Sequence, residues 1–258
     1  MLRDRTKIAM VMAEFLGTGI FVLTAMSVMA NFGNSIFVAL VAGLAIASIY
    51  MVFSRVSGGH FNPAVTLGML SVRRIPLFLA IVYIAAQLLG AMVAYALYTY
   101  LMNQNIKPNT HFDSRILVSE AVGALVFSMG WASAVYNRYN TARTAFTIGG
   151  SLAIGIMVAS FANTGFVNPA LALGMQSWGW GTYVLGPVLG AVIGFNLYAL
   201  LFAPANALEA EEEALEASDE DTGDAELEIA EEAATVVHTG TVKAVRPRAG
   251  RAKKRSRK

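Results

Sequence analysis

Long apolar runs alternate with short polar segments along most of this chain. Six of the runs are long enough to cross the hydrocarbon core of a bilayer, which takes about 20 apolar residues in a helix. We predict membrane-spanning helices at residues 8–29, 36–53, 75–101, 116–136, 144–162 and 179–202. The first run follows a charged N-terminus, but it is long enough to span, so we expect a helix there and not a signal peptide.

Two further apolar stretches, residues 63–71 and 169–176, are too short to span. Each follows an Asn-Pro pair, and Asn is a good helix cap while Pro is favoured in the first helical turn. We therefore predict two half-helices that enter the membrane and end midway. The fold class is then an all-α membrane protein with six spanning helices and two re-entrant half-helices.

The tripeptide Asn-Pro-Ala marks an internal repeat. It occurs at Asn62-Pro63-Ala64 and again at Asn168-Pro169-Ala170. The eight residues that start at each Asn agree at six positions. The repeat halves cover about residues 8–102 and 116–202, with three spans each, so the second half must be inverted in the membrane. The half-helices then meet near the midplane, and such a junction is where membrane proteins of this kind carry their solute site.

Composition excludes several classes of function. The chain is 56% hydrophobic and has no cysteine, which removes disulfides and thiol chemistry. Its three histidines are scattered without metal-ligand spacing. We find no nucleophile–base set and no phosphate-binding loop. We therefore expect no enzyme activity, no metal and no cofactor.

The basic residues of the short loops predict the orientation in the membrane. Eight of them fall on one side of the six predicted spans: Arg3, Arg5, Lys7, Arg55, Arg73, Arg74, Arg138 and Arg143. The other side carries Lys107 and Arg115. Since cytoplasmic loops are enriched in Lys and Arg, we expect both termini in the cytoplasm. The membrane we expect is the plasma membrane.

The C-terminal segment differs from the rest of the chain. We predict a membrane domain at residues 1–205 and a tail at 206–258, with thirteen acidic residues at 209–232 and nine basic ones at 243–258. We expect the tail to be disordered; a solvated helix over the acidic part is the alternative. The basic end suits anionic lipid head groups or the acidic run itself. We favour a solubilising tail, and we expect no specific nucleic acid partner.

Three segments resemble the aquaporin, or major intrinsic protein, family. They read AEFLGTG at residues 13–19, SGGHFNPAVTLG at 57–68 and NTGFVNPALALG at 163–174. One Asn-Pro-Ala is a weak signal, whereas two in register inside six spans are a strong one. The resemblance covers about residues 8–202. It implies a passive channel for water or small neutral solutes, with one pore in each subunit of a homotetramer.

The predicted half-helices suit a conduit. A helix N-terminus carries about half a positive charge, so two such ends at one point repel cations and disfavour a hydrated proton. Asn62 and Asn168 would cap the half-helices and also present amide donors to the lumen; the alternative is that they only cap. Backbone carbonyls before each motif would act as acceptors, at Gly59, His60, Phe61, Gly165, Phe166 and Val167. Irregular backbone is tolerated in a membrane where it lines a watery cavity.

Glu14 and Glu120 are the acidic residues inside the predicted spans, and each precedes its Asn by 48 residues. An intramembrane carboxylate is a functional candidate. One hypothesis is a proton relay in a secondary carrier. The other is an anchor that accepts hydrogen bonds from the re-entrant loop. The equal spacing favours the anchor, and the family resemblance implies it.

The sequence departs from the family at the predicted selectivity filter. Most members have an arginine directly after the second motif, and this chain has Leu171. Family spacing places the other filter positions at Ala42, Ile156 and Gly165. We expect a filter wider and less polar than the usual water filter, so neither water-only nor glycerol specificity carries over. Water, ammonia, hydrogen peroxide, carbon dioxide and small polyols are the candidate solutes. A non-conducting structural membrane protein is a further alternative.

Overall fold

The computed structural model describes residues 2–32, 35–162 and 165–205, which belong to one compact unit. The predicted tail at residues 206–258 lies outside the described residues. The long helices are α1 (Leu2–Phe32), α2 (Ser35–Ser57), α4 (Leu77–Met102), α5 (Ser114–Tyr136) and α6 (Thr141–Ala159). The last span joins a π-helical turn, η1 (Gly181–Leu185), to α8 (Gly186–Leu201). Two short helices are α3 (Pro63–Ser71) and α7 (Pro169–Gly174).

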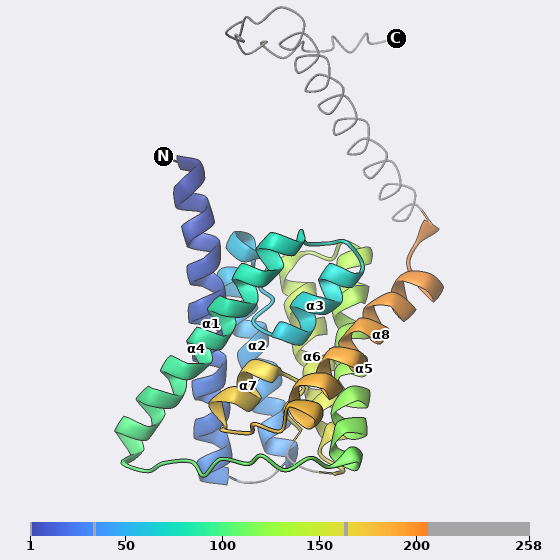
Figure 1. Cartoon of the computed structure of the whole chain (residues 1–258). Coiled ribbons are helices and arrows are strands. Elements are labelled where there is room, and N and C mark those ends of the chain that lie inside the picture. The colour runs from blue at the N-terminus through green and yellow to red at the C-terminus, as the bar shows by residue number, and fades with distance from the viewer. Residues whose placement is uncertain (1, 33–34, 163–164, 206–258) are drawn as a thin grey trace, which may run out of the picture. The chain divides into compact units, whose positions relative to one another are not determined.

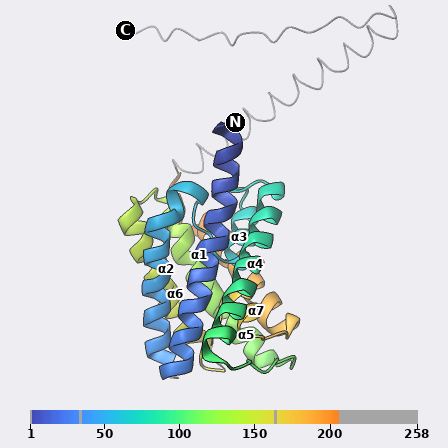
Figure 2. The ribbon, with the colours of Figure 1, turned by 90° about the vertical axis from the view of Figure 1, so that its left-hand side faces the viewer.

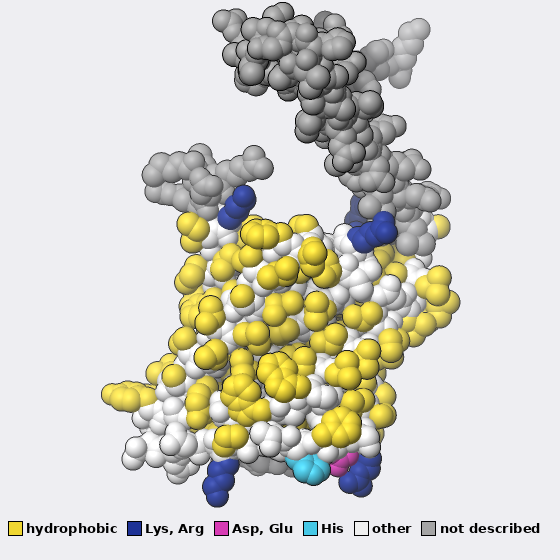
Figure 3. All heavy atoms as spheres, viewed as in Figure 1, with side chains coloured by type: hydrophobic (Ala, Val, Ile, Leu, Met, Phe, Trp, Pro, Cys, Tyr) yellow, Lys and Arg dark blue, Asp and Glu magenta, His cyan; other side chains and the backbone are white. Residues whose placement is uncertain are grey.

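Six helical segments within the described residues are long and apolar enough to cross a membrane. They correspond one to one with the six predicted spans. Hydrophobic side chains cover the middle of the face in Figure 3, and the Lys and Arg side chains on that face lie at its two ends. This banding is what a bilayer requires, because charged groups are costly in the hydrocarbon and stable at its boundaries.

The two halves are arranged as an inverted pair. α1 packs against α2 and α4 in the first half, α5 packs against α6 and α8 in the second, and α2 contacts α6 across the halves. Figures 1 and 2 both show α3 near the end of the bundle that holds the N-terminus and α7 nearer the opposite end. α3 and α7 contact each other, so the half-helices approach from opposite sides and meet inside the bundle.

Two glycines allow α2 and α6 to approach each other closely across the halves. A Cβ atom built on Gly149 of α6 would lie 2.5 Å from the carbonyl oxygen of Gly43 on α2. A Cβ on Gly43 would collide in turn with the carbonyl of Gly149. Side chains at these two positions would push the helices apart, which explains why the repeat keeps glycine 19 residues before each Asn.

Most helix boundaries differ from the predicted ones by one to six residues, and two of these differences have an identifiable reason. α7 ends at Gly174 and not at 176, because the following backbone turns into the left-handed region at Gln176, where φ is +55°. α6 begins at Thr141 and not at 144, because Asn140 caps it by accepting a hydrogen bond from the Arg143 N–H at 2.9 Å.

Candidate functional site

The two asparagines of the repeated motif cap the half-helices. The Asn62 Oδ1 accepts a hydrogen bond from the Ala64 N–H at 2.8 Å at the start of α3. The Asn168 Oδ1 accepts one from Ala170 at 2.9 Å and a longer one from Leu171 at 3.4 Å at the start of α7. Pro63 and Pro169 occupy the first helical position, where the missing N–H has no helical partner to lose.

The same asparagines also join the two half-helices to each other. The Asn62 Nδ2 donates to the carbonyl oxygen of Val167 at 2.9 Å, and the Asn168 Nδ2 donates to that of Phe61 at 3.1 Å. An amide NH2 has two hydrogens, so each asparagine keeps one hydrogen beyond this bond. The structure thus brings the two predicted motifs together in a reciprocal contact. The backbone carbonyls of Phe61 and Val167 accept the hydrogen bonds of this contact.

The residue before each asparagine has an unusual backbone. Phe61 has φ +50° and Val167 has φ +56°, and both are non-glycine residues in the left-handed region. Such a conformation is unfavourable for a β-branched residue such as Val, and it persists where the surroundings hold it in place. The turn points each N–H toward a buried carboxylate and each carbonyl toward the opposite asparagine.

Glu14 supplies that carboxylate in the first half. Its side chain is fully buried on α1. Oε1 accepts hydrogen bonds from the Ser57 Oγ at 2.7 Å and from the His60 N–H at 2.9 Å. Oε2 accepts from the Phe61 N–H at 2.7 Å and from the Gln87 Nε2 at 2.8 Å. Four donors surround this carboxylate: two belong to the loop before α3, one to the last residue of α2 and one to α4.

Glu120 has the equivalent place in the second half. Its fully buried side chain on α5 accepts hydrogen bonds from the backbone N–H of Phe166 at 2.7 Å and of Val167 at 2.6 Å. The two loops are therefore held in the same way, each by a glutamate of the first helix of its repeat. The sequence spacing of 48 residues reflects this contact.

Sequence reasoning gave no role at the first loop to three polar residues that lie around it: Ser57, Thr66 and Tyr83. The Thr66 Oγ1 accepts from the Gln87 Nε2 at 3.0 Å and lies 3.1 Å from the His60 Nδ1. The Tyr83 hydroxyl donates to the Ser57 carbonyl at 2.8 Å. The available signal was Thr66, a polar residue in the middle of a mostly apolar half-helix, at the position where the second repeat has Ala172.

The four predicted filter residues come from three helices and one loop. Ala42 lies on α2, Ile156 on α6, Leu171 in the first turn of α7, and Gly165 in the loop before it. Gly165 has φ +69°, and a Cβ there would lie 2.7 Å from the carbonyl oxygen of Ile156, so the structure places these two residues in contact. None of the four side chains is charged or can donate a hydrogen bond. Ala42, Ile156 and Leu171 are only 3%, 1% and 2% exposed.

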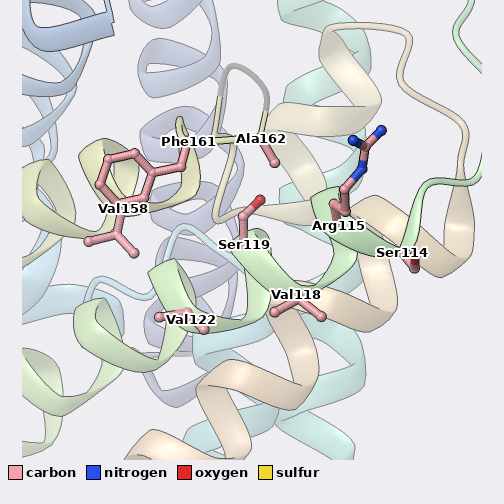
Figure 4. A pocket seen from close by; sticks show the side chains of 8 residues that line it. All are labelled: Ser114, Arg115, Val118, Ser119, Val122, Val158, Phe161 and Ala162. Atoms are coloured by element: carbon pink, nitrogen blue, oxygen red, sulfur yellow. The ribbon is translucent and has the colours of Figure 1, made fainter.

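A groove of about 830 Å³ lies away from the motifs (Figure 4). Its lining residues come from α5, from the end of α6 and from the turn after it, with Arg115 and Ser119 on one side and Val158 and Phe161 on the other. Arg115 pairs with Asp113 at 3.2 Å, and this hydrogen bond holds the pKa of the Asp113 carboxyl below its usual range. None of the described residues that line this groove belongs to an Asn-Pro-Ala motif.

Replacing Asn168 with alanine should lower the thermal stability more than the loss of a helix cap does. A lost cap costs about 1 kcal/mol, and the buried Phe61 carbonyl would also lose its donor, at roughly 1–3 kcal/mol. Asn140→Ala is the matched control, because Asn140 is also a cap but its recorded side-chain bond stays within α6. Thermal unfolding of the two purified variants measures the difference. Equal midpoints would contradict a stabilising contact between the loops.

Six spanning helices with two half-helices joined at their N-termini define an inverted-repeat membrane channel. The family model described as "Major intrinsic protein" matches residues 1–201. Aquaporin-4 of Bos taurus is 34% identical over 220 residues, which cover 75% of this chain and 67% of the relative. A glycerol uptake facilitator protein-like 6 of Lactiplantibacillus plantarum is 37% identical over 202 residues, covering 70% of this chain and 93% of the relative.

The fold is also similar to that of a solved structure. An aquaglyceroporin from Plasmodium falciparum superposes with a TM-score of 0.65 at 23% identity, covering 77% of this chain and 98% of that one. The chain belongs to the major intrinsic protein family. It is an integral multi-pass membrane protein and a channel, not an enzyme, and the predicted fold class is confirmed.

Proposed function

We propose that each subunit conducts small neutral solutes passively through its own pore, that water is one of these solutes, and that cations and protons are disfavoured. The observation that carries the proposal is the meeting of two half-helix N-termini at Asn62 and Asn168, 2.9 and 3.1 Å from the opposite loop carbonyls. Two positive helix ends at one point raise the local potential. The remaining amide hydrogens orient a passing water with its oxygen toward them, which interrupts the donor chain that proton hopping needs.

The residues at the filter support a broad choice of solutes. Leu171 replaces the charge that the family resemblance leads one to expect, and Ala42, Ile156 and Gly165 add no donor. A site without hydrogen-bonding groups discriminates poorly between solutes of similar size. We therefore propose that ammonia, hydrogen peroxide, carbon dioxide and small polyols are candidates beside water. Relatives named aquaporin and glycerol uptake facilitator are both similar to this chain.

The hydrogen bonds of the two glutamates support the anchor hypothesis over a carrier. Carriers move protons or ions through groups that change partners, whereas Glu14 already accepts four hydrogen bonds, two from the loop backbone. Glu120 likewise accepts two from its loop. We propose that both are fixed supports of the re-entrant loops. Uptake that saturates and follows an imposed proton gradient would favour the carrier instead.

One observation favours a second candidate, a channel that is closed or non-conducting in this state. The filter residues Ala42, Ile156 and Leu171 are almost fully buried. Where apolar residues form the narrowest point of a pore, they close it by excluding water. Intact protein that passes no solute above the level of bare lipid would support this candidate.

Assembly and placement in the cell complete the proposal. We propose a homotetramer in the plasma membrane with both termini in the cytoplasm. The orientation is supported by the basic residues of the loops on one side. The lipid bilayer is the surrounding partner. The tail is proposed to solubilise, and its basic end to contact anionic head groups.

Stopped-flow light scattering on proteoliposomes tests the conduction proposal. Water, glycerol, urea and hydrogen peroxide would be compared with protein-free vesicles, and a proton-sensitive dye inside the vesicles would report leakage. We expect faster solute flux without faster proton entry. If no solute passes faster than through bare lipid, the channel is closed or the proposal is wrong; proton entry would contradict the role of the helix ends.

Leu171→Arg should narrow the range of solutes. An added guanidinium reduces the space at the first turn of α7 and introduces donors, so we expect glycerol flux to fall roughly tenfold relative to water flux. Leu171→Met is the matched control, because it keeps an apolar side chain of similar volume. Elution volume establishes that both variants are intact. An unchanged glycerol-to-water ratio in a folded Leu171→Arg protein would show that Leu171 lies outside the filter.

A further inference from the structure

An apolar crevice of about 200 Å³ lies behind the two Asn-Pro-Ala motifs, between α4 and the last span. Its floor comes from the half-helices, with Pro63 and Leu67 on α3 and Pro169 and Leu173 on α7. These are equivalent positions in the two repeats, since each leucine follows its proline by four residues. Residues four apart lie on one helix face, so both half-helices turn the same face toward the crevice.

The walls of the crevice follow the same symmetry. Ile84 and Leu88 line it from α4, while Val184 of η1 and Val188 of α8 line it from the last span. These positions are equivalent in the two repeats, because Tyr83 directly precedes Ile84 as Tyr183 directly precedes Val184. The crevice is therefore assembled from matching positions of both halves, and each contributes aliphatic side chains.

One end of the crevice breaks this symmetry. Ser177, Trp178 and Trp180 line it where the last span begins. The tryptophans are 37% and 67% exposed, and the Trp178 Nε1 donates to the Gln176 Oε1 at 3.2 Å. Tryptophan is enriched at the boundary between hydrocarbon and water. This end of the crevice therefore opens near one membrane surface, and the other end reaches inward to the paired prolines.

The helix surfaces beside the crevice face outward. Ile81 and Leu89 on α4 are exposed, as are Leu185 and Leu189 on the last span. The face in Figure 3 shows hydrophobic side chains over the region between these helices, with α3 and α7 visible between them in Figure 1. In a membrane, exposed aliphatic side chains on spanning helices contact lipid chains, so the crevice opens into a lipid-facing surface.

We infer that this crevice binds one acyl chain of a phospholipid, which enters from the leaflet at Trp178 and Trp180 and ends near Pro63 and Pro169. None of the described lining residues is charged, and a water molecule there would lack the two to four polar partners that it needs. An acyl chain matches the apolar lining of the space, and it buries apolar surface on both half-helices. The occupant would support the motifs from the side opposite the asparagine amides.

Tryptophan quenching by brominated lipid tests this inference. The protein would be reconstituted into vesicles of phosphatidylcholine brominated along one acyl chain, in a Trp180→Phe background. Trp178 then reports the crevice, while Trp131, which is 2% exposed, serves as an unquenched reference. We expect Val188→Phe to reduce the quenching about twofold, because the larger side chain fills the space of the chain. Leu189→Phe is the matched control on the neighbouring, exposed position.

Each outcome decides the inference. Less quenching with Val188→Phe and no change with Leu189→Phe supports a chain in the crevice. Equal quenching in both variants overturns it, as does an equal loss in both. An unquenched Trp178 without either substitution also overturns it and shows that protein covers the crevice. If Val188→Phe does not fold, Ile84→Phe fills the opposite wall, with Ile81→Phe as its exposed control.

Discussion

Replacing Glu14 with alanine is expected to prevent the protein from folding into a stable channel. Four donors lose their acceptor: the Ser57 hydroxyl, the N–H groups of His60 and Phe61, and the Gln87 amide. A buried donor without a partner costs roughly 1–3 kcal/mol. The sum is comparable with the whole stability of a typical domain, about 5–15 kcal/mol. Phe61 would also lose the contact that holds its left-handed backbone.

Thermal unfolding and elution volume of the purified protein measure this effect. The thermal stability of Glu14→Gln should lie between those of the wild type and Glu14→Ala. The amide keeps one acceptor oxygen, but its NH2 group faces two of the four donors and cannot accept from them. Met12→Ala is the control for a shortened side chain on α1, since Met12 is exposed. A Glu14→Ala protein with wild-type midpoint and flux would rule out the anchor role. A stable Glu14→Gln protein that had lost a proton-driven uptake would support the carrier.

The half-helices show what the sequence determines and what it leaves open. The range predicted for the first, 63–71, matches α3 at both ends, because Asn62 and Pro63 specify the start and the motif is followed by two arginines. The second was predicted two residues too long. Its end depends on the backbone turn at Gln176, and glutamine carries no sequence signal for positive φ.

The contacts of the two glutamates could be predicted from the sequence, whereas those between the two asparagine loops could not. Equal spacing linked Glu14 to Asn62 and Glu120 to Asn168, since a duplicated distance in a duplicated fold implies a repeated contact. The crossed bonds from each asparagine to the opposite loop required both halves in three dimensions. That the filter residues form the narrowest point of a pore stays a prediction. The spacing of the family motif indicates which residues lie at the filter, but it does not give the radius of the pore there.

The repeat also explains why the acyl-chain crevice and the asparagine contact occur together. The two halves are repeats of each other, so the half-helices use equivalent residues where they meet. Each has Asn on the side of the proposed conduit, and Pro and Leu on the side of the crevice. A short helix with few backbone bonds of its own depends on both faces being packed. Polar partners hold one side, and apolar contacts hold the other.

Gly149→Leu is expected to disrupt the contact between α2 and α6, whereas Gly150→Leu should be tolerated. A Cβ at 149 would lie 2.5 Å from the Gly43 carbonyl oxygen and 2.9 Å from the Ala47 Cβ. A backbone carbonyl cannot rotate away, so the helices must separate. We expect the loss of folding free energy to exceed the 1–3 kcal/mol that is typical of overpacking, which is about what a side chain that can move would cost. At 150 a Cβ would meet nothing within 4 Å, and the position gains up to about 1 kcal/mol of helix propensity.

Elution profile and thermal unfolding of the two neighbouring variants give a direct comparison. Gly43→Leu should reproduce the Gly149 result from the other helix, because the two glycines contact each other reciprocally. A Gly149→Leu protein as stable as Gly150→Leu would mean that α2 and α6 do not meet at this point. The inverted packing of the two halves, and with it the meeting of the two asparagines, would then lose its physical basis.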